Sequence, residues 1–299
     1  MCIRDRYAAG PSINIIATYL ALLLLSAAAT GMVASHSGVY ATGIISDEGA
    51  EEGGLMPYEI IIRIDGVRIS NYSEFSEQMK LLSAGDEVTL TKLSQPNSDG
   101  LRTVRDISVT LGDRHDYYID RCEGDLVCIE DTESILADLG IEKGDAFLGV
   151  SNLRSTNSTV HMYSIITSSE RGFLQAPLGM IGIPIAYDGQ TMLLEEREMM
   201  RAGDGVIASA LGTDGMLMLF DFLFWMVWIN FLLGFANLIP MIPFDGGHIV
   251  KDGVHSVLSR LAKGANPLRI ESIAGRISSM SSFVILFIVM MPIILPRLV

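Results

Sequence analysis

Cysteine is scarce in this chain, with three residues among 299. Three are too few for a disulfide framework, and no pair has the Cys-x-x-Cys spacing of a zinc site. Cys122 and Cys128 are near enough in sequence to close one small loop in an oxidising compartment. Two unpaired thiols are the alternative, and the sequence leaves both open.

Basic residues are also few. Lys and Arg number 21 against 35 Asp and Glu, so the formal net charge is −14. Proteins that bind nucleic acid use clustered Lys and Arg to neutralise phosphates. The charge therefore argues against a nucleic-acid partner. It does not argue against a membrane, because the acidic residues are unevenly distributed along the chain.

Apolar residues are abundant, at 49% of the sequence. Three apolar segments predict bilayer-crossing helices, at about residues 13–33, 216–239 and 283–295. The first is too long for the core of a signal peptide, and the third is short for a full span. The sequence therefore predicts a multi-pass integral membrane protein.

Charge placement predicts the topology of these spans. Arg4 and Arg6 precede the first span, and residues 249–281, between the second and third, are rich in Lys and Arg. By the positive-inside tendency both segments are predicted to be cytoplasmic. The acidic region between the first two spans, with sequons at Asn71 and Asn157, is predicted to be extracytoplasmic.

The region from residue 38 to 112 has a different pattern, of short alternating strands separated by turns. Strands are predicted at 39–45, at 59–69 with a hairpin turn at Asp65-Gly66, and at 86–91 and 105–111. A short helix is predicted from Ser73 to Leu82, starting at the serine with Glu77 in its first turns. These elements predict a small α+β domain.

This order of elements resembles a PDZ domain of the kind found in bacterial and archaeal proteases, with Gly-Leu-Met-Pro at 54–57 and Ile-Asp-Gly at 64–66. Such domains bind an extended peptide by adding it as a strand to a sheet edge. The resemblance implies peptide termini as partners, and a groove lined by Val39, Tyr40, Ala41 and Thr42. A small α+β domain without a peptide ligand is the alternative.

The most specific pattern lies at the end of the second apolar segment, where residues 237–248 read Asn-Leu-Ile-Pro-Met-Ile-Pro-Phe-Asp-Gly-Gly-His. Its carboxylate, Asp245, would cost roughly 2.5–3.5 kcal/mol at membrane depth and so normally faces protein, water or a metal. Two prolines interrupt the helix and two glycines allow close backbone approach; these are Pro240, Pro243, Gly246 and Gly247. Without further context, Asp245 could be an N-cap where a helix leaves the bilayer.

The spacing Asn-x-x-Pro-x-x-Pro-x-Asp-Gly-Gly resembles the signature of the site-2 protease family of intramembrane zinc metalloproteases. The resemblance implies that Asp245 is a zinc ligand and that Asn237 positions the substrate or polarises its scissile carbonyl. It implies Zn²⁺ as the cofactor. It also implies single-pass membrane proteins as substrates, cleaved in or near their transmembrane helices in regulated intramembrane proteolysis.

The other half of such a zinc site is absent from this sequence. A catalytic zinc takes three protein ligands, and His-Glu-x-x-His would supply two of them and a general base on one helix face. None of the five histidines is followed by Glu. His248 is near Asp245 in sequence, but we interpret it as a residue at the start of a helix.

Residues 8–14, Ala-Ala-Gly-Pro-Ser-Ile-Asn, account for this absence. They resemble the Ala-Gly-Pro-x-x-Asn element of the same family, which follows the helix that bears His-Glu-x-x-His, so Gly10, Pro11 and Asn14 are motif residues here. Pro11 suits the first turn of a helix, and Asn14 inside an apolar span needs a polar partner. We therefore expect an N-terminally truncated fragment that is inactive by itself.

Together these features predict a membrane α-helical core of about three transmembrane helices with an inserted PDZ-like α+β domain. The predicted segments are an N-terminal helix in 1–36, the PDZ-like domain in 37–113, an accessory extracytoplasmic insertion in 114–214, and the helices with the Asp245 motif in 215–299. Within the insertion, the pattern predicts a helix and a strand at 135–150, a loop at 151–159 and a helix at 195–201.

Two functions from different classes fit these expectations. The first is an intramembrane zinc metalloendopeptidase of the site-2 protease type. The alternative is a non-catalytic, membrane-anchored PDZ-type protein that binds peptides.

Overall fold

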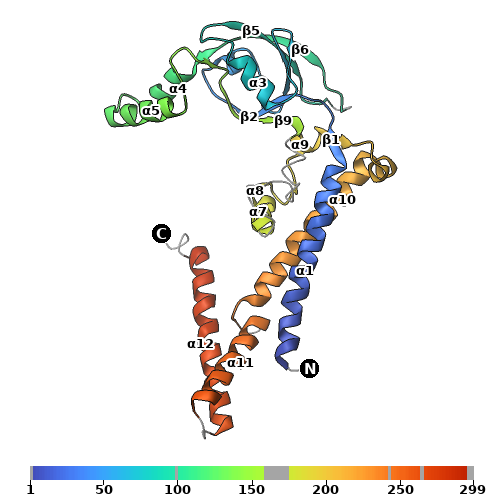
Figure 1. Cartoon of the computed structure of the whole chain (residues 1–299), viewed down its shortest axis with the longest axis vertical. Coiled ribbons are helices and arrows are strands. Elements are labelled where there is room, and N and C mark those ends of the chain that lie inside the picture. Colours follow the sequence, from blue (N-terminus) through green and yellow to red (C-terminus); the bar gives the residue numbers. More distant parts are fainter. Residues whose placement is uncertain (1–2, 98–99, 158–174, 242–243, 263–265, 295–299) are drawn as a thin grey trace. The chain divides into compact units, whose positions relative to one another are not determined.

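A computed structural model of the chain describes residues 3–97, 100–157, 175–241, 244–262 and 266–294 (Figure 1). It has two compact units, each built from separate stretches of chain. One contains residues 1–26, 168–186 and 218–299, and the other contains residues 27–167 and 187–217. The first unit is made of apolar helices and the second contains the β-sheets.

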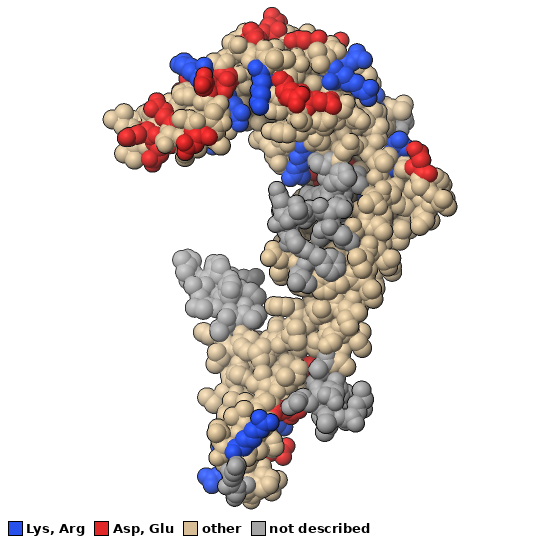
Figure 2. Space-filling model, viewed as in Figure 1, with Lys and Arg blue, Asp and Glu red and all other residues tan. Residues whose placement is uncertain are grey.

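Three helices in the described part of the chain are long and apolar enough to cross a membrane, over Ala9–Thr30, Val206–Leu238 and Pro267–Phe287. They belong to α1 (Ile3–Thr30), α10 (Val206–Leu238) and α12 (Pro267–Ile294). Large apolar side chains such as Ile13, Phe222 and Phe283 are exposed on them. Their surfaces carry few charged side chains (Figure 2). These helices confirm that the chain has a membrane-embedded part.

The bounds of the three helices differ from the predicted spans. α1 ends at Thr30, because the chain then forms a short strand, β1 (Met32–Ala34). α10 begins well before residue 216, with a break at Gly212, where φ is 67°. α12 begins at Pro267, where Asn266 caps the helix by accepting a hydrogen bond from the Leu268 amide at 3.0 Å. Hydropathy does not detect the start of α12, because its first turns contain charged side chains.

Shorter helices complete the apolar unit. They are α7 (Ala176–Met180), α8 (Ile183–Ala186) and α11 (Asp245–Leu261). The Trp228 indole of α10 donates a hydrogen bond to the Ile181 carbonyl at 3.2 Å. α11 packs on α12, where the Ser278 hydroxyl donates to the buried Gly247 carbonyl at 3.1 Å.

The second unit is built around a sheet with the strand order β6-β5-β3-β2-β9, in which β4 pairs with β3. Its strands are β2 (Val39–Ile44), β3 (Ile60–Ile64), β4 (Val67–Arg68), β5 (Glu87–Leu93), β6 (Val104–Thr110) and β9 (Val150–Ser155). All pairings within it are antiparallel. The predicted hairpin at Asp65-Gly66 is confirmed, with positive φ angles of 47° and 78°.

Helices and small ladders surround this sheet. They are α2 (Gly49–Glu52), α3 (Tyr72–Met79), α4 (Arg114–Asp120), α5 (Leu126–Asp138), α9 (Leu194–Arg197), β7 (Gly112–Asp113) paired with β8 (Ala146–Phe147), and β1 paired with β10 (Met200–Ala202). The core contains Ile61, Ile64, Phe75, Leu90 and Val109. It lies between the sheet and α3, so α3 is anchored through Phe75.

Three sequence-based expectations in this unit were wrong. The helix predicted at 73–82 is confirmed as α3, but its cap is not Ser73: Asn71, two residues upstream, accepts from the Glu74 amide at 3.0 Å. Residues 150–155, placed mainly in a predicted loop, form β9. The predicted helix at 195–201 is the single turn α9 followed by β10.

Candidate metal-ligand site and peptide groove

Asp245 is the first residue of α11, directly after the break that ends α10 at Leu238. The N-cap position is occupied by Phe244, which has extended backbone angles and no side-chain capping bond. Asp245 is partly buried. It is therefore held at a helix start inside the apolar unit, without occupying the N-cap position itself.

Gly246 explains how α11 can begin so close to the end of α10. A Cβ atom at this position would lie 2.4 Å from the Ile239 carbonyl oxygen and 2.5 Å from that of Leu238. Both neighbours are backbone atoms, so no side-chain rearrangement would relieve the contact. The first turn of α11 therefore fits against the last turn of α10 only because residue 246 has no side chain.

The two motif segments, more than two hundred residues apart, meet at this point. A Cβ atom on Gly10 of α1 would lie 3.0 Å from the Asp245 Oδ2 atom. Asn14 lies one turn further along α1. A Cβ atom added at Gly234 of α10 would lie 3.3 Å from the Asn14 Cβ atom. The predicted motif residues on α1 and at the start of α11 thus lie in one neighbourhood.

The remaining motif residues lie nearby or outside the described part. Asn237 is in the last turn of α10 and is half-buried, and Pro240 follows that helix. Pro243 lies outside the described residues. Pro11 is buried inside α1 and not in its first turn, because the helix begins at Ile3. The expectation for Pro11 was therefore wrong.

Asp245 does not form a complete zinc site with the other described residues. No group of three or more His, Cys, Asp or Glu side chains in the described segments is arranged to hold a metal. A catalytic zinc takes three protein ligands, so the described residues do not supply a full set. His248 has a polar or electrostatic partner in the structure.

Sequence reasoning missed two residues that position this site. Gly234 of α10 contacts α1, where an added Cβ would lie 2.8 Å from the Ile15 Cδ1 atom. Ser278 of α12 is fully buried and holds the first turn of α11 through its bond to Gly247. A small residue inside an apolar span is a signal for close helix packing, and could have identified Gly234.

A second candidate site lies in the other unit, in a cavity of about 310 Å³ between α3 and β9. From α3 it is lined by Tyr72, Phe75, Ser76 and Met79, and from β9 by Val150, Asn152 and Leu153. β9 is the last strand of the sheet among the described residues, so its outer edge has no strand partner there. A cavity with both polar and apolar lining, beside an open strand edge, is typical of a groove for an extended peptide.

The residues Val39, Tyr40, Ala41 and Thr42, predicted to line a peptide groove, lie in β2. This strand pairs with β3 on one side, through Val39 and Tyr40, and with β9 on the other side along most of its length. The side of β2 that does not pair with β3 is therefore paired with β9. The open edge of the sheet on this side is that of β9.

The structure thus describes a polytopic membrane protein with a motif carboxylate at a helix start and a sheet unit that begins between its first two spans. Residues 5–286 match Peptidase family M50, so the chain belongs to this family, the family of the site-2 proteases. The chain is also similar to a Mesorhizobium japonicum protein named "Putative zinc metalloprotease mll0638", with 26% identity over 262 residues. That match covers 84% of this chain and 61% of the relative, so the chain spans about three fifths of the relative's length.

Proposed function

We propose that this chain is part of an intramembrane zinc metalloendopeptidase that cleaves transmembrane segments of single-pass membrane proteins. The observation that carries the proposal is the contact between the two motif segments, with Gly10 of α1 lying against the Asp245 carboxylate. A carboxylate enclosed by helix ends at membrane depth is costly and is usually retained for a function. Membership of Peptidase family M50 supports the same class of reaction.

In this proposal Asp245 supplies one zinc ligand. The other two ligands and the general base come from a His-Glu-x-x-His helix that is not among these 299 residues. Asn237 donates a hydrogen bond from its amide to the scissile carbonyl, and one such donor typically contributes about 10²–10³ in rate. The substrate helix must unwind locally, because a helical backbone has its carbonyl groups engaged in hydrogen bonds.

The test uses the complete product of the gene, purified in detergent, with zinc content and cleavage of a reporter transmembrane substrate as readouts. We expect Asp245→Ala to lose both zinc and cleavage, and Asn237→Ala to keep zinc and lose about 10²–10³ in rate. Asp252→Asn, on the same helix, is the matched control and should change neither. Full zinc occupancy and cleavage in Asp245→Ala would refute the proposal.

We also propose that the sheet unit lies outside the cytoplasm and that residues 249–281 are cytoplasmic. The bond between Cys122 and Cys128 supports this side, because disulfides persist mainly in oxidising compartments. Alkaline phosphatase fused after residue 140 should be active in cells, and the same enzyme fused after residue 262 should not be. The reverse pattern would overturn the proposed topology.

The cavity between α3 and β9 favours a second function, the binding of extended peptides by a PDZ-like domain. We place the groove at β9 and no longer at β2, because the open strand edge is at β9. A bound peptide would pair with this edge and place an apolar side chain near Phe75 and Met79.

A bulky side chain in the cavity tests this second function. Ser76→Trp, which fills the cavity from α3, should abolish binding of peptides to the full chain in detergent. Glu77→Trp, on the exposed side of the same helix, should leave binding unchanged. Equal binding by both variants would show that this cavity is not the peptide site.

A further inference from the structure

The segment that contains α7 and α8 is uncharged and apolar. Residues 175–187 include no Asp, Glu, Lys or Arg. Within them, Ala176–Ala186 is an apolar helical stretch, in which Leu178 is 56% exposed and Ile185 is 76% exposed. Single exposed apolar side chains are common on protein surfaces, so the surroundings of this segment have to be decided from its position.

One face of the segment is packed inside the apolar unit. Ala176, Pro177, Met180 and Pro184, which recur at helical spacing, are buried. The segment belongs to the same unit as α11, α12 and most of α10, whereas the chain before residue 168 and after residue 186 belongs to the sheet unit. The chain therefore leaves the sheet unit, packs among the apolar helices, and returns to the sheet unit.

The Trp228 indole sets the depth of the segment along α10. It donates to the Ile181 carbonyl at 3.2 Å, directly after the end of α7. At 1.5 Å per helical residue, Trp228 lies roughly 10 Å along α10 from Asp221 and roughly 15 Å from Leu238. Residues 222–244 contain no charged side chain. The bond therefore lies in the uncharged interior of the span, and Ile181 is at membrane depth.

The segment is too short to cross the bilayer. Even a continuous helix over Ala176–Ala186 would extend only about 17 Å, against a hydrocarbon core of about 30 Å. Both of its flanks belong to the sheet unit, which also contains the last residues of α1 and the first residues of α10. The chain must therefore enter and leave the membrane on one side, the side on which α10 begins.

A path of this kind needs a partner for backbone groups where the helix is broken. Ile181 lies between α7 and α8, outside both helices, and is half-buried. Non-helical backbone at membrane depth is tolerated only where protein covers it or water reaches it. The Trp228 indole satisfies this carbonyl. Asp221, two turns earlier on the same face of α10, is also half-buried and has a polar or electrostatic partner. This face of α10 is therefore directed toward protein and not toward lipid.

We infer that residues 176–186 form a re-entrant membrane segment, held on α10 by Trp228, whose outer face contacts lipid acyl chains. Leu178 and Ile185 provide that face. Phe222 and Ile229 are exposed at similar depth along α10 and contact lipid in the same way. The sheet unit is thereby attached to the membrane at a third place, in addition to α1 and α10. Such an attachment requires neither protease activity nor peptide binding.

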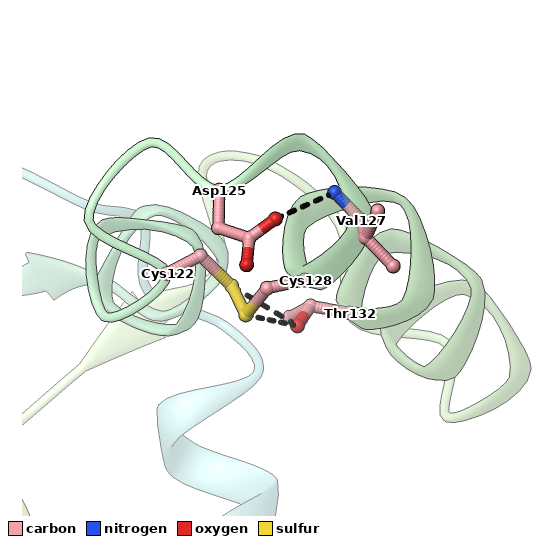
Figure 3. The surroundings of a disulfide bond; sticks show 5 residues. All are labelled: Cys122, Asp125, Val127, Cys128 and Thr132. Atoms are coloured by element: carbon pink, nitrogen blue, oxygen red, sulfur yellow. Dashed lines mark hydrogen bonds between the residues drawn. A yellow bond between two sulfur atoms is a disulfide. The ribbon is translucent and has the colours of Figure 1, made fainter.

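Spin labelling of the full chain in phosphatidylcholine liposomes tests this segment. A nitroxide is attached to Ile185→Cys in a chain that also carries Cys2→Ser. Cys122 and Cys128 do not take up the label, because a disulfide joins them (Figure 3). The measured quantity is the ratio of two collision rates of the nitroxide. One is with oxygen, which concentrates in hydrocarbon, and the other is with a water-soluble nickel chelate, which hydrocarbon excludes.

Two further label positions calibrate this ratio. Phe222→Cys is exposed on the apolar helix α10, and Leu139→Cys is exposed at the end of α5 in the sheet unit. The ratio at Ile185 should be close to that at Phe222 and well above that at Leu139. A ratio at Ile185 as low as that at Leu139 would overturn the re-entrant path. Low collision rates with both reagents would show that protein covers Ile185, and would overturn the contact with lipid.

A second variant tests the role of the indole. Trp228→Phe should shift the ratio at Ile185 toward the value at Leu139, because the Ile181 carbonyl would then lack its donor at membrane depth. Trp225→Phe, the same change three residues earlier, leaves the bond in place and should not shift the ratio. If Trp228→Phe leaves a high ratio at Ile185 unchanged, the segment remains in the membrane and the role of Trp228 is overturned.

Discussion

Two glycines of α11 should respond in opposite directions to the same substitution. At Gly246 an added methyl group would meet two backbone carbonyl oxygens, 2.4 Å from Ile239 and 2.5 Å from Leu238. At Gly253, which is exposed on the same helix, nothing lies within 4 Å of the added atom. Both substitutions replace glycine by alanine in one helix, so their opposite effects report on the close approach of Gly246 to α10.

The expected magnitudes follow from these contacts. Gly253→Ala should stabilise the protein by about 0.5–1 kcal/mol, since alanine loses less conformational entropy than glycine in a helix. Gly246→Ala should destabilise it by about 1–3 kcal/mol, the usual cost of forcing an extra methyl group into a packed site. At roughly 2–4 °C per kcal/mol for a unit of this size, the midpoint should fall by roughly 2–12 °C.

Thermal unfolding of the purified full chain, followed by tryptophan fluorescence in one detergent, measures both variants. Trp225 and Trp228 lie on α10 and report on the unit that contains Asp245. The difference in sign between the two variants matters more than either value, because both are measured in the same detergent. If Gly246→Ala is as stable as Gly253→Ala, the first turn of α11 does not pack on the end of α10 as described.

Three further predictions test the sheet unit. Lys92 and Glu59 form a buried ion pair. In denaturant titrations, Lys92→Met should lower the free energy of unfolding by about 3–5 kcal/mol, because it leaves the Glu59 carboxylate buried and unpaired. The double variant Lys92→Met/Glu59→Gln should recover most of that lost free energy. Burial, and then neighbouring acidic side chains, raise the pKa of Glu48 above its ordinary value of 4.5. Its contribution to stability is therefore lost as the pH rises through the folded-state pKa, and Glu48→Gln should remove that dependence from melting curves. Asn71→Ala, which removes the cap of α3, should cost about 0.5–2 kcal/mol by the same titration, and no loss would contradict this role of Asn71.

The features that were predicted correctly depend only on residues that lie close together in the sequence. The hairpin at Asp65-Gly66 needs only two residues that tolerate positive φ. The apolar spans need only a long enough run of apolar side chains. The motif around Asp245 is likewise contiguous, so its position at a helix start could be anticipated. The start of α12 at Pro267 could not be found from hydropathy, because its first turns contain Arg269, Glu271 and Arg276.

The groove could not be placed from the sequence, because it depends on which strand is at the edge of the sheet. β9 reads Val-Ser-Asn-Leu-Arg-Ser and has the polar content of a loop. It becomes a strand by pairing with β2, more than one hundred residues earlier. A polar strand is stable at a sheet edge, where one side of its backbone faces solvent. Only the long-range pairing distinguishes it from a loop.

A buried carboxylate connects this edge strand to the chain that leads into α10. Glu196 of α9 is fully buried, and its Oε1 atom accepts hydrogen bonds from the Tyr40 hydroxyl at 3.0 Å and from Arg154 of β9 at 3.2 Å. A few residues later, β10 pairs with β1, which directly follows α1. A buried charge held by two donors on adjacent strands resists displacement, because an unpaired carboxylate there would be costly. The strand that lines the groove and the segments that continue into α1 and α10 therefore belong to one packed unit.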